Sequence, residues 1–275
     1  MTERGADPLD IVEGTLEHDL PYYAFGAGEA LVVLRWFTPD HANPTGLERR
    51  SELKALEDLG RSFRVYAVNR APHMPAGTTM ADIANDHADA IRKQFGEAVF
   101  VLGMSSGGSL ALQLAVDHPD VVRKLVIAGS AYTLSEKTRA VQRDYTEAVA
   151  AGKRGAHLQA PVTVDSKLEQ ALLVPVLWLT DPFLRPEDPQ DMLHFAQAED
   201  SFDVGDRLGD ISMPTLVIGG DRDLAYSTEL FRATAEGIPG AELIIYPKAG
   251  HIGTFTNKRY VDDVTTFLQG KTVQK

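Results

Sequence analysis

Three polar side chains in loops could together perform nucleophilic catalysis: Ser105, Asp223 and His251. Ser105 lies in "GMSSG", which fits the pattern G-x-S-x-G at Gly103 and Gly107. Clusters of glycine and serine usually mark ordinary loops, so the pattern alone is a weak signal. Here it follows the apolar run "AVFVL" and opens the helical run "GGSLALQLA". That context favours a strained turn that holds a serine hydroxyl above a sheet.

The spacing of the glycines decides which of two adjacent serines is the candidate nucleophile. Gly103 and Gly107 lie two residues before and two residues after Ser105. They remove the Cβ atoms that would collide in a turn of this kind. We therefore predict that Ser105 attacks the substrate. Ser106, at the start of the following helix, would instead contribute its backbone N–H to an oxyanion hole.

A serine hydroxyl needs a base to accept its proton, and that base needs an acid to orient it. In the chain order expected for this turn, the acid follows the serine and the histidine comes last. "TLVIGGDRD" brings Asp223 just beyond one apolar run, and "IIYPKAGH" brings His251 just beyond the next. Asp221 is the alternative acid, and strand-end spacing favours Asp223. The sequence therefore predicts a catalytic triad of Ser105, Asp223 and His251.

The elements that must position these residues are short apolar runs, rich in β-branched residues and bounded by turn signals. They span residues 30–37, 63–68, 98–103, 124–129, 215–220 and 241–247. Nearly continuous runs of this kind are typical of strands buried on both faces of a parallel sheet. Helical patterns separate the runs, and residues 10–30 predict two antiparallel strands before them. The expected fold class is α/β, with a mostly parallel central sheet flanked by helices.

The alternation of strands and helices stops between about residues 132 and 212, where only helical patterns are found. We predict a core formed by residues 1–131 and 213–275, with residues 132–212 inserted as a helical cap over one end of the sheet. An ordinary extra helical layer is the alternative. The inserted segment contains an apolar stripe of Leu172, Leu173, Val176, Leu177 and Trp178. We expect this stripe to pack in the core, and lining an acyl pocket is the alternative.

Composition excludes several classes of function. The 275 residues carry a formal charge of −12, so nothing attracts this surface to nucleic acid or anionic lipid. The chain has no cysteine, no run long enough to span a membrane and no apolar signal segment at its start. Neither zinc-binding spacing nor a nucleotide-binding glycine loop is present. We expect a cytoplasmic protein without metal or cofactor that acts on a small molecule, its state as monomer or homodimer left open.

The chain resembles the α/β-hydrolase fold family over nearly its whole length. "GMSSGG" is similar to the family's nucleophile turn, and "AGH" is similar to its histidine loop. "GGDRD" resembles its acid loop, with Asp223 in the acid position. The helical segment at residues 132–212 falls where the family inserts its cap. Three motifs in order are specific for the fold and much less so for the substrate.

One loop departs from the family pattern. Many relatives carry His-Gly after their third strand, where this chain has Arg35 and Trp36. That loop normally supplies the second N–H of the oxyanion hole, which by position comes from Phe37, with Trp36 as the alternative donor. A backbone donor survives a change of side chain, but the Trp36 indole would reshape the acyl side. We expect Arg35 to pair with a nearby acid such as Asp40; contact with an anionic substrate group is the alternative.

Serine at the turn also narrows the reaction that the resemblance implies. Relatives that open epoxides or remove halides generally use aspartate there, so Ser105 favours acyl transfer. We expect hydrolysis of a carboxylic ester with a small or medium acyl group, through an acyl-enzyme whose oxyanion is held by the N–H groups of Ser106 and Phe37. Lactone, C–C bond and perhydrolase chemistry on the same triad stay open. So does a non-hydrolytic ligand receptor, because a fold does not fix function.

Overall fold

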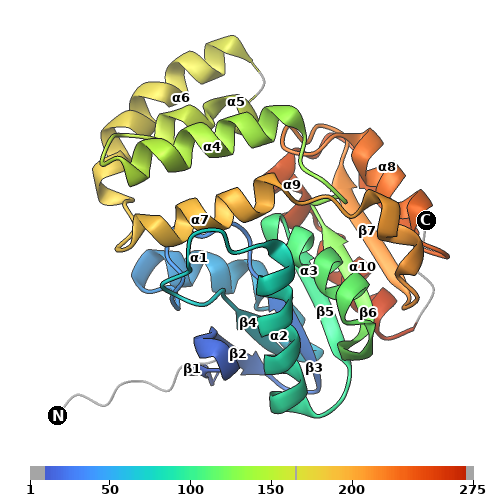
Figure 1. Ribbon diagram of the computed structural model, residues 1–275. Helices are drawn as coiled ribbons and strands as arrows, with labels where there is room; N and C mark the ends of the chain where they lie inside the picture. Colours follow the sequence, from blue (N-terminus) through green and yellow to red (C-terminus); the bar gives the residue numbers. More distant parts are fainter. Residues whose placement is uncertain (1–9, 165, 271–275) are drawn as a thin grey trace.

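The computed structural model describes residues 10–164 and 166–270. Its centre is an eight-stranded sheet in the order β1-β2-β4-β3-β5-β6-β7-β8 (Figure 1). Strand β2 is antiparallel to β1 and β4, and the remaining neighbours pair in parallel. The strands are β1 (Val12–Thr15), β2 (Pro21–Gly26), β3 (Glu29–Leu34), β4 (Phe63–Val68), β5 (Val99–Met104), β6 (Val122–Ala128), β7 (Thr215–Gly220) and β8 (Glu242–Tyr246). The predicted fold class is confirmed, and two antiparallel strands do precede the parallel ones.

The central strands are buried on both faces, which explains why their sequences are continuous apolar runs rather than alternating ones. Along β3, Leu31 and Val33 point into one hydrophobic cluster, and Val32 and Leu34 point into the other. None of these four side chains is more than 1% exposed. Successive residues of a strand face opposite sides, so each side needs its own covering helices.

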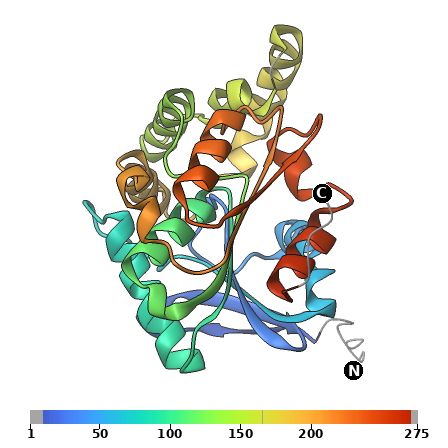
Figure 2. The ribbon, with the colours of Figure 1, turned by 90° about the vertical axis from the view of Figure 1, so that its right-hand side faces the viewer.

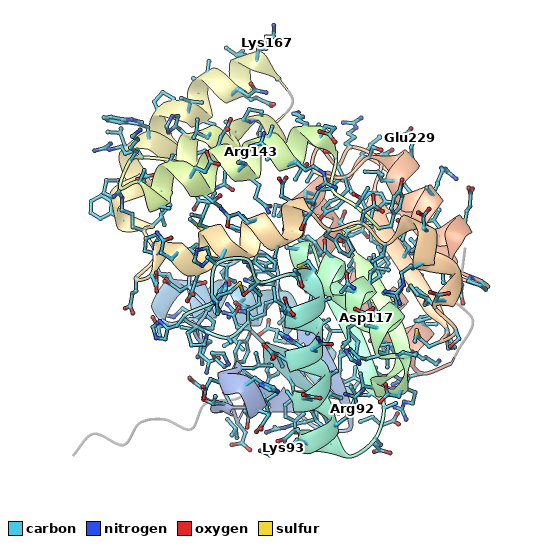
Figure 3. The ribbon with its side chains drawn as sticks, in the orientation of Figure 1. Arg92, Lys93, Asp117, Arg143, Lys167 and Glu229 are labelled. Carbon is cyan, nitrogen blue, oxygen red and sulfur yellow. The ribbon has the colours of Figure 1, made fainter. Side chains whose placement is uncertain are left out.

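Helices cover both faces of the sheet, as the rotated view shows (Figure 2). Helices α1 and α10 contribute to the cluster on one face, and α2 and α3 contribute to the cluster on the other. Helix α8 packs against β7 and β8. The outer faces of the helices carry charged side chains, such as Arg92 and Lys93 on α2 (Figure 3). The bounds of these helices are α1 (Gly46–Leu56), α2 (Met80–Phe95), α3 (Ser106–Asp117), α8 (Thr228–Gly237) and α10 (Tyr260–Leu268).

Strand β3 is shorter than the apolar run that predicted it. The run spans residues 30–37, but the strand ends at Leu34. Arg35, Trp36 and Phe37 therefore lie in the loop that follows the carboxyl end of β3. This difference matters because ligand sites in open α/β sheets lie at the carboxyl ends of the strands.

Four helices lie between β6 and β7 in the sequence: α4 (Glu136–Ala150), α5 (Ala160–Thr163), α6 (Lys167–Thr180) and α7 (Pro189–Asp200). They gather on one side of the molecule, with α7 nearest the sheet-bearing part and α6 farthest out (Figure 1). In the described ranges, the segment between Gly129 and Pro214 contains no strand of the sheet. The division into a core and a cap at residues 132–212 stays a prediction.

Helix α6 differs from what its sequence suggested. Its apolar stripe was expected to pack in the core or to line a pocket, but Leu172 is 68% exposed and Val176 is 54% exposed. The described residues of α6 include none that is buried. Both expectations for this stripe are wrong, because α6 packs against α5 and short neighbouring turns and not against the sheet. No helix in the described ranges, α6 included, is both long and apolar enough to cross a membrane.

Candidate active site

The turn between β5 and α3 holds Ser105 in a strained backbone conformation. Its φ is 52° and its ψ is −125°, in a region that residues with a side chain rarely adopt. The turn persists because its backbone is anchored: the Ser105 N–H donates to the Ala128 carbonyl at 2.9 Å. The Gly108 N–H donates to the Ser105 carbonyl at 2.7 Å. A serine on such a turn projects its hydroxyl away from the sheet.

The two glycines of the pattern permit close approaches around this turn. A Cβ on Gly107 would come within 2.6 Å of the Arg35 carbonyl oxygen, and it would also collide with the Leu34 carbonyl. A Cβ on Gly103 would come within 2.6 Å of the Ala111 side chain. Real Cβ atoms do not come so close to other atoms, so glycine lets the loop after β3 lie directly against the first turn of α3.

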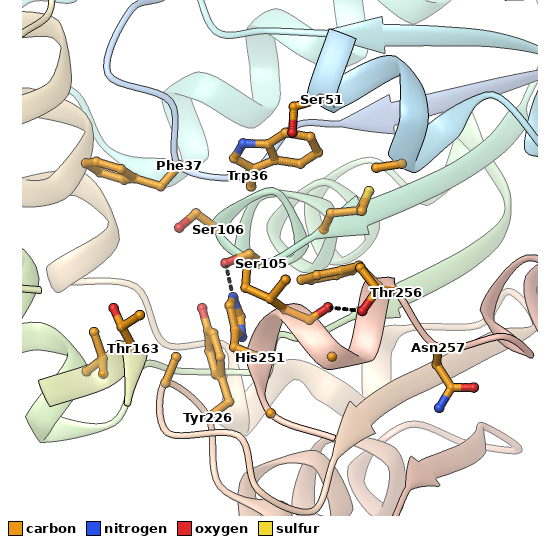
Figure 4. A pocket seen from close by; sticks show the side chains of 18 of the residues that line it. Trp36, Phe37, Ser51, Ser105, Ser106, Thr163, Tyr226, His251, Thr256 and Asn257 are labelled. Carbon is orange, nitrogen blue, oxygen red and sulfur yellow. Dashed lines mark hydrogen bonds between the residues drawn. The ribbon is translucent and has the colours of Figure 1, made fainter. Parts of the chain in front are cut away.

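His251 connects the Ser105 hydroxyl to a buried carboxylate. Figure 4 shows its contact with Ser105. It is the first residue of α9 (His251–Phe255), which follows β8. Its Nε2 lies 2.9 Å from Ser105 Oγ, and its Nδ1 lies 2.8 Å from Asp223 Oδ2. A carboxylate at Nδ1 fixes the tautomer in which Nδ1 carries the proton, so Nε2 is free to accept one. The structure thus brings together all three side chains of the predicted triad.

Asp223 is the acid in this arrangement, and not Asp221. The Asp223 side chain is fully buried, and its Oδ1 accepts hydrogen bonds from the N–H groups of Ala225 at 2.8 Å and Tyr226 at 3.1 Å. These two donors satisfy one carboxylate oxygen while the other faces His251. In the described residues, no hydrogen bond or ion pair joins Asp221 to His251. The Asp221 N–H instead donates to the Tyr246 carbonyl of β8 at 3.1 Å.

Two aromatic rings that the sequence did not single out fix the plane of the imidazole. The Tyr226 ring is stacked on His251 at 6.1 Å between centroids, and the Phe255 ring meets it edge-on at 5.5 Å. Tyr226 follows Asp223 by three residues, and Phe255 follows His251 by four. An aromatic residue within four positions of the predicted acid and base is a signal that could have found both.

The groups expected to hold an oxyanion surround the Ser105 hydroxyl. Ser106 is the first residue of α3, so its N–H has no partner within the helix. Trp36 and Phe37 line the same cavity as Ser105 and Ser106 (Figure 4). Within residues 10–164 and 166–270, neither the Trp36 nor the Phe37 N–H donates a hydrogen bond to another group of the chain. Three backbone N–H groups are therefore available in the residues that line the cavity with Ser105.

Arg35 lies beneath this loop and does not line the cavity. Arg35 does pair with an acid, as expected, but the acid is Glu52 and not the named Asp40. Arg35 Nε lies 2.6 Å from Glu52 Oε1, and Nη2 lies 2.7 Å from Glu52 Oε2. Helix α1 carries Glu52 against the sheet, where both side chains are at most 1% exposed. Asp40 instead accepts a hydrogen bond from the Glu187 N–H at 2.7 Å. The alternative, contact of Arg35 with an anionic substrate group, is contradicted by its burial.

Ser105 opens into a cavity of about 1250 Å³ that extends in two directions. One end lies beneath α4 and α5, where the uncharged side chains of Val141, Tyr145 and Val162 share the wall with those of Gln142 and Thr163. The other end lies between α1 and the start of α10 and is polar, with Ser51, Lys54 and Asn257 in its wall. The cavity thus offers environments of different polarity on its two sides. Among the described residues, no cluster of His, Asp or Glu side chains could hold a metal ion.

A buried carboxyl that the sequence did not predict lies behind the first turn of α3. Glu199 of α7 is 0% exposed and accepts hydrogen bonds from Ser109 Oγ at 2.9 Å and Gln142 Nε2 at 3.0 Å. Burial raises the pKa of this carboxyl above its usual range. The two hydrogen bonds join α7 and α4 to α3, the helix that follows Ser105.

Comparison with known proteins agrees with this architecture. RutD of Yersinia enterocolitica, a proposed carbamate hydrolase, is 29% identical over 229 residues, covering 76% of this chain and 78% of its own length. The pimeloyl-[acyl-carrier protein] methyl ester esterase of Nitrosomonas europaea is 25% identical, covering 71% of this chain and 81% of its own. A solved esterase from Thermogutta terrifontis superposes with a TM-score of 0.72 at 22% identity, over 94% of this chain and 98% of its own. The family model of the alpha/beta hydrolase fold matches residues 35–258, and the chain belongs to this family.

Proposed function

We propose that this protein is a serine hydrolase that cleaves a carboxylic ester with a small or medium acyl group. The observation that carries the proposal is the continuous chain from Ser105 Oγ to His251 Nε2 at 2.9 Å and from His251 Nδ1 to Asp223 at 2.8 Å. A binding protein has no need for a serine held at a φ of 52° in line with a base and an acid. Relatives named as hydrolases and esterases support the same reaction class.

The proposed mechanism assigns one role to each group. His251 takes the Ser105 proton as Oγ attacks the ester carbonyl, and Asp223 stabilises the imidazolium that forms. The carbonyl oxygen becomes an oxyanion that the N–H groups of Ser106 and Phe37 receive. His251 then gives its proton to the leaving alkoxide, which departs as an alcohol and leaves the acyl group on Ser105. A water molecule, deprotonated by His251, releases the acid by the same steps in reverse.

The cavity supports a substrate with two unlike ends. Val141, Tyr145 and Val162 beneath α4 and α5 offer apolar contacts to an acyl chain, and the polar wall between α1 and α10 suits a hydrophilic alcohol. Burial of one methylene is worth about 0.8 kcal/mol, or up to about fourfold in kcat/KM. We therefore expect kcat/KM to rise from an acetate to a hexanoate ester.

A second candidate reaction is hydrolysis of a carbamate. The observation that favours it is the likeness to RutD proteins, which are named as proposed carbamate hydrolases. A carbamate carbonyl would be attacked by the same serine, so the triad alone does not distinguish the two. A matched pair of p-nitrophenyl substrates, a butyrate ester and an N-propyl carbamate, separates them by the ratio of their kcat/KM values.

The test is a p-nitrophenyl ester panel from acetate to decanoate, run with the wild type, Ser105→Ala and Ser106→Ala. We expect Ser105→Ala to lose about 10⁴-fold or more in kcat, since only binding and the oxyanion hole then remain. Ser106→Ala is the matched control, because its proposed role uses the backbone N–H alone. A fluorophosphonate should label Ser105 in the wild type. Absence of both turnover and labelling would refute the hydrolase proposal.

A further inference from the structure

The loop that carries the Phe37 N–H is held from beneath by a buried cation. Arg70 lies two residues beyond the carboxyl end of β4 and is 1% exposed. Strand β4 pairs in parallel with β3, with Val68 beside Leu34. This register brings Arg70 next to the loop at residues 35–38.

The Arg70 guanidinium contacts two backbone carbonyls and one side chain of this loop. Its Nη1 donates to the Trp36 carbonyl at 3.3 Å and to the Arg35 carbonyl at 3.4 Å. Its Nη2 donates to the same Trp36 carbonyl at 3.4 Å and to Thr38 Oγ1 at 2.7 Å. One planar, five-donor group can bridge acceptors in this way, which a lysine ammonium cannot reproduce.

The remaining surroundings of Arg70 hold its plane. Its Nε donates to His41 Nε2 at 3.2 Å, and His41 Nδ1 bonds to the Ala71 carbonyl at 2.8 Å. Burial lowers the pKa of His41 to about 3, so this ring is neutral and can accept the bond. The Phe195 ring of α7 covers the guanidinium at 4.0 Å. The arginine is thus fixed from its edge by a histidine and from its face by an aromatic ring.

This cation has no direct carboxylate partner. Within the described residues, no carboxylate oxygen lies within 4.0 Å of an Arg70 nitrogen, although buried charges are normally paired. Burial and the neighbouring Arg35 lower the pKa of the Arg70 guanidinium accordingly. Arg70 is buried without a carboxylate, and backbone carbonyls are among the groups that accept its hydrogen bonds. The Trp36 carbonyl accepts two of them, from Nη1 and Nη2.

The Trp36 carbonyl and the Phe37 N–H belong to one peptide group. In a trans peptide the C=O and the N–H point in opposite directions, so a carbonyl drawn toward Arg70 sends the N–H away from it. Hydrogen bonding to the carbonyl also polarises the peptide and strengthens its N–H as a donor, by about 10–30% per bond. We propose that Arg70 is a positioning residue that aims and polarises the Phe37 N–H for the oxyanion. The inference rests on the proposed function, which uses that N–H.

The test compares Arg70→Gln and Arg70→Lys with Thr38→Val, which removes the Nη2–Oγ1 contact and leaves the Trp36 carbonyl contact intact. Removal of a whole oxyanion donor costs about 10²–10³ in kcat, so a weakened donor should cost about 10- to 100-fold. We expect Arg70→Gln to lose this much in kcat with KM for the ester within about threefold of the wild type. The kcat of Arg70→Lys should lie between those of Arg70→Gln and the wild type. The kcat of Thr38→Val should stay within about threefold of the wild type.

A second readout reports the peptide group itself. Proteins labelled with ¹⁵N-phenylalanine give an amide signal for Phe37, assigned by its loss in Phe37→Leu. Attachment of a phosphonate to Ser105 should shift this amide proton downfield in the wild type and less in Arg70→Gln. Equal shifts in both proteins, or a kcat loss matched by Thr38→Val, would overturn the inference.

The inference and the proposed function fail in different ways. If the wild type neither turns over esters nor reacts with the phosphonate, the proposed function fails. The free proteins then still test Arg70, because its loss should move the Phe37 amide proton upfield, and an unchanged signal overturns the inference. If turnover depends on Ser105 but is indifferent to Arg70, the hydrolase proposal stands and the inference falls.

Discussion

Removal of the charge of Glu52 is expected to destabilise the protein far more than a surface substitution would. The Arg35–Glu52 pair is completely buried, with two contacts at 2.6 and 2.7 Å. Glu52→Gln leaves the guanidinium inside the protein without a full counter-charge, since Glu48 lies 3.8 Å away and is about half exposed. Breaking a buried pair from one side costs about 3–5 kcal/mol. For a chain of this size, that lowers Tm by about 6–20 °C.

The double variant Arg35→Met/Glu52→Gln shows whether the cost comes from the orphaned charge. It removes both charges of this pair, and the glutamine can still accept the Tyr23 hydroxyl, which donates to Glu52 at 2.9 Å. The Ala42 carbonyl loses Arg35 Nη1 but keeps the Asn69 side-chain amide at 2.9 Å. We therefore expect the double variant to be more stable than Glu52→Gln alone, although it carries one more substitution.

Urea unfolding followed by circular dichroism gives the free energies, and ester hydrolysis tests the role of Arg35. The ratio of kcat/KM for an anionic hemisuccinate and a neutral butyrate p-nitrophenyl ester should be the same in the double variant and the wild type. A cost below about 1 kcal/mol for Glu52→Gln would refute the argument from burial. A selective loss of the anionic ester in the double variant would show that Arg35 meets substrate after all.

Two further predictions concern the helix that follows the nucleophile. Gly107→Ala should lower kcat by about 5-fold or more, because its Cβ would push the Arg35 carbonyl and the loop after it away from α3, an overpacking cost of about 1–3 kcal/mol. Gly209→Ala, whose Cβ would meet nothing within 4 Å, is the control, and equal kcat losses would contradict the reasoning. Burial raises the pKa of Glu199 in the folded protein above its ordinary value. As pH rises from the ordinary pKa through the raised one, the wild type therefore loses stability, because the carboxyl ionises more readily in the unfolded chain. Glu199→Gln should therefore raise Tm at pH 8 and give no advantage at pH 4, and a Tm difference independent of pH would argue against this.

The parts of the site that the sequence predicted are those that depend on local backbone rules. The glycine spacing around Ser105 reflects close approaches at a single turn, which is why two residues on either side identify the serine. Asp223 and His251 were found because parallel strands bring their carboxyl ends to one edge, so residues just beyond two such strands meet. The same regularity made the α/β class readable from apolar runs alone.

The parts that the sequence did not predict depend on packing between distant segments. Arg35 was assigned to Asp40, five residues away, but its partner Glu52 is brought in by the docking of α1 on the sheet. The prediction for the apolar stripe on α6 was wrong for a related reason. Apolar composition does not show whether another part of the protein covers the stripe. Leu172 has the residue type of a core position and 68% exposure. Neither outcome follows from local spacing.

Under the proposed function, the loop after β3 would keep the backbone geometry of the family's oxyanion loop with different side chains. An oxyanion needs only peptide N–H groups at fixed places, so the residues that follow Leu34 are free to change if something else holds their backbone. Here Arg35 is tied down by Glu52, and the Trp36 carbonyl is held by Arg70. Gly107 lets α3 come close enough to use the result. The contacts of Glu52, Arg70 and Gly107 with this loop come from three different parts of the chain. The Arg-Trp pair that stands in place of His-Gly is therefore best understood as a change of side chains on a backbone that these contacts fix.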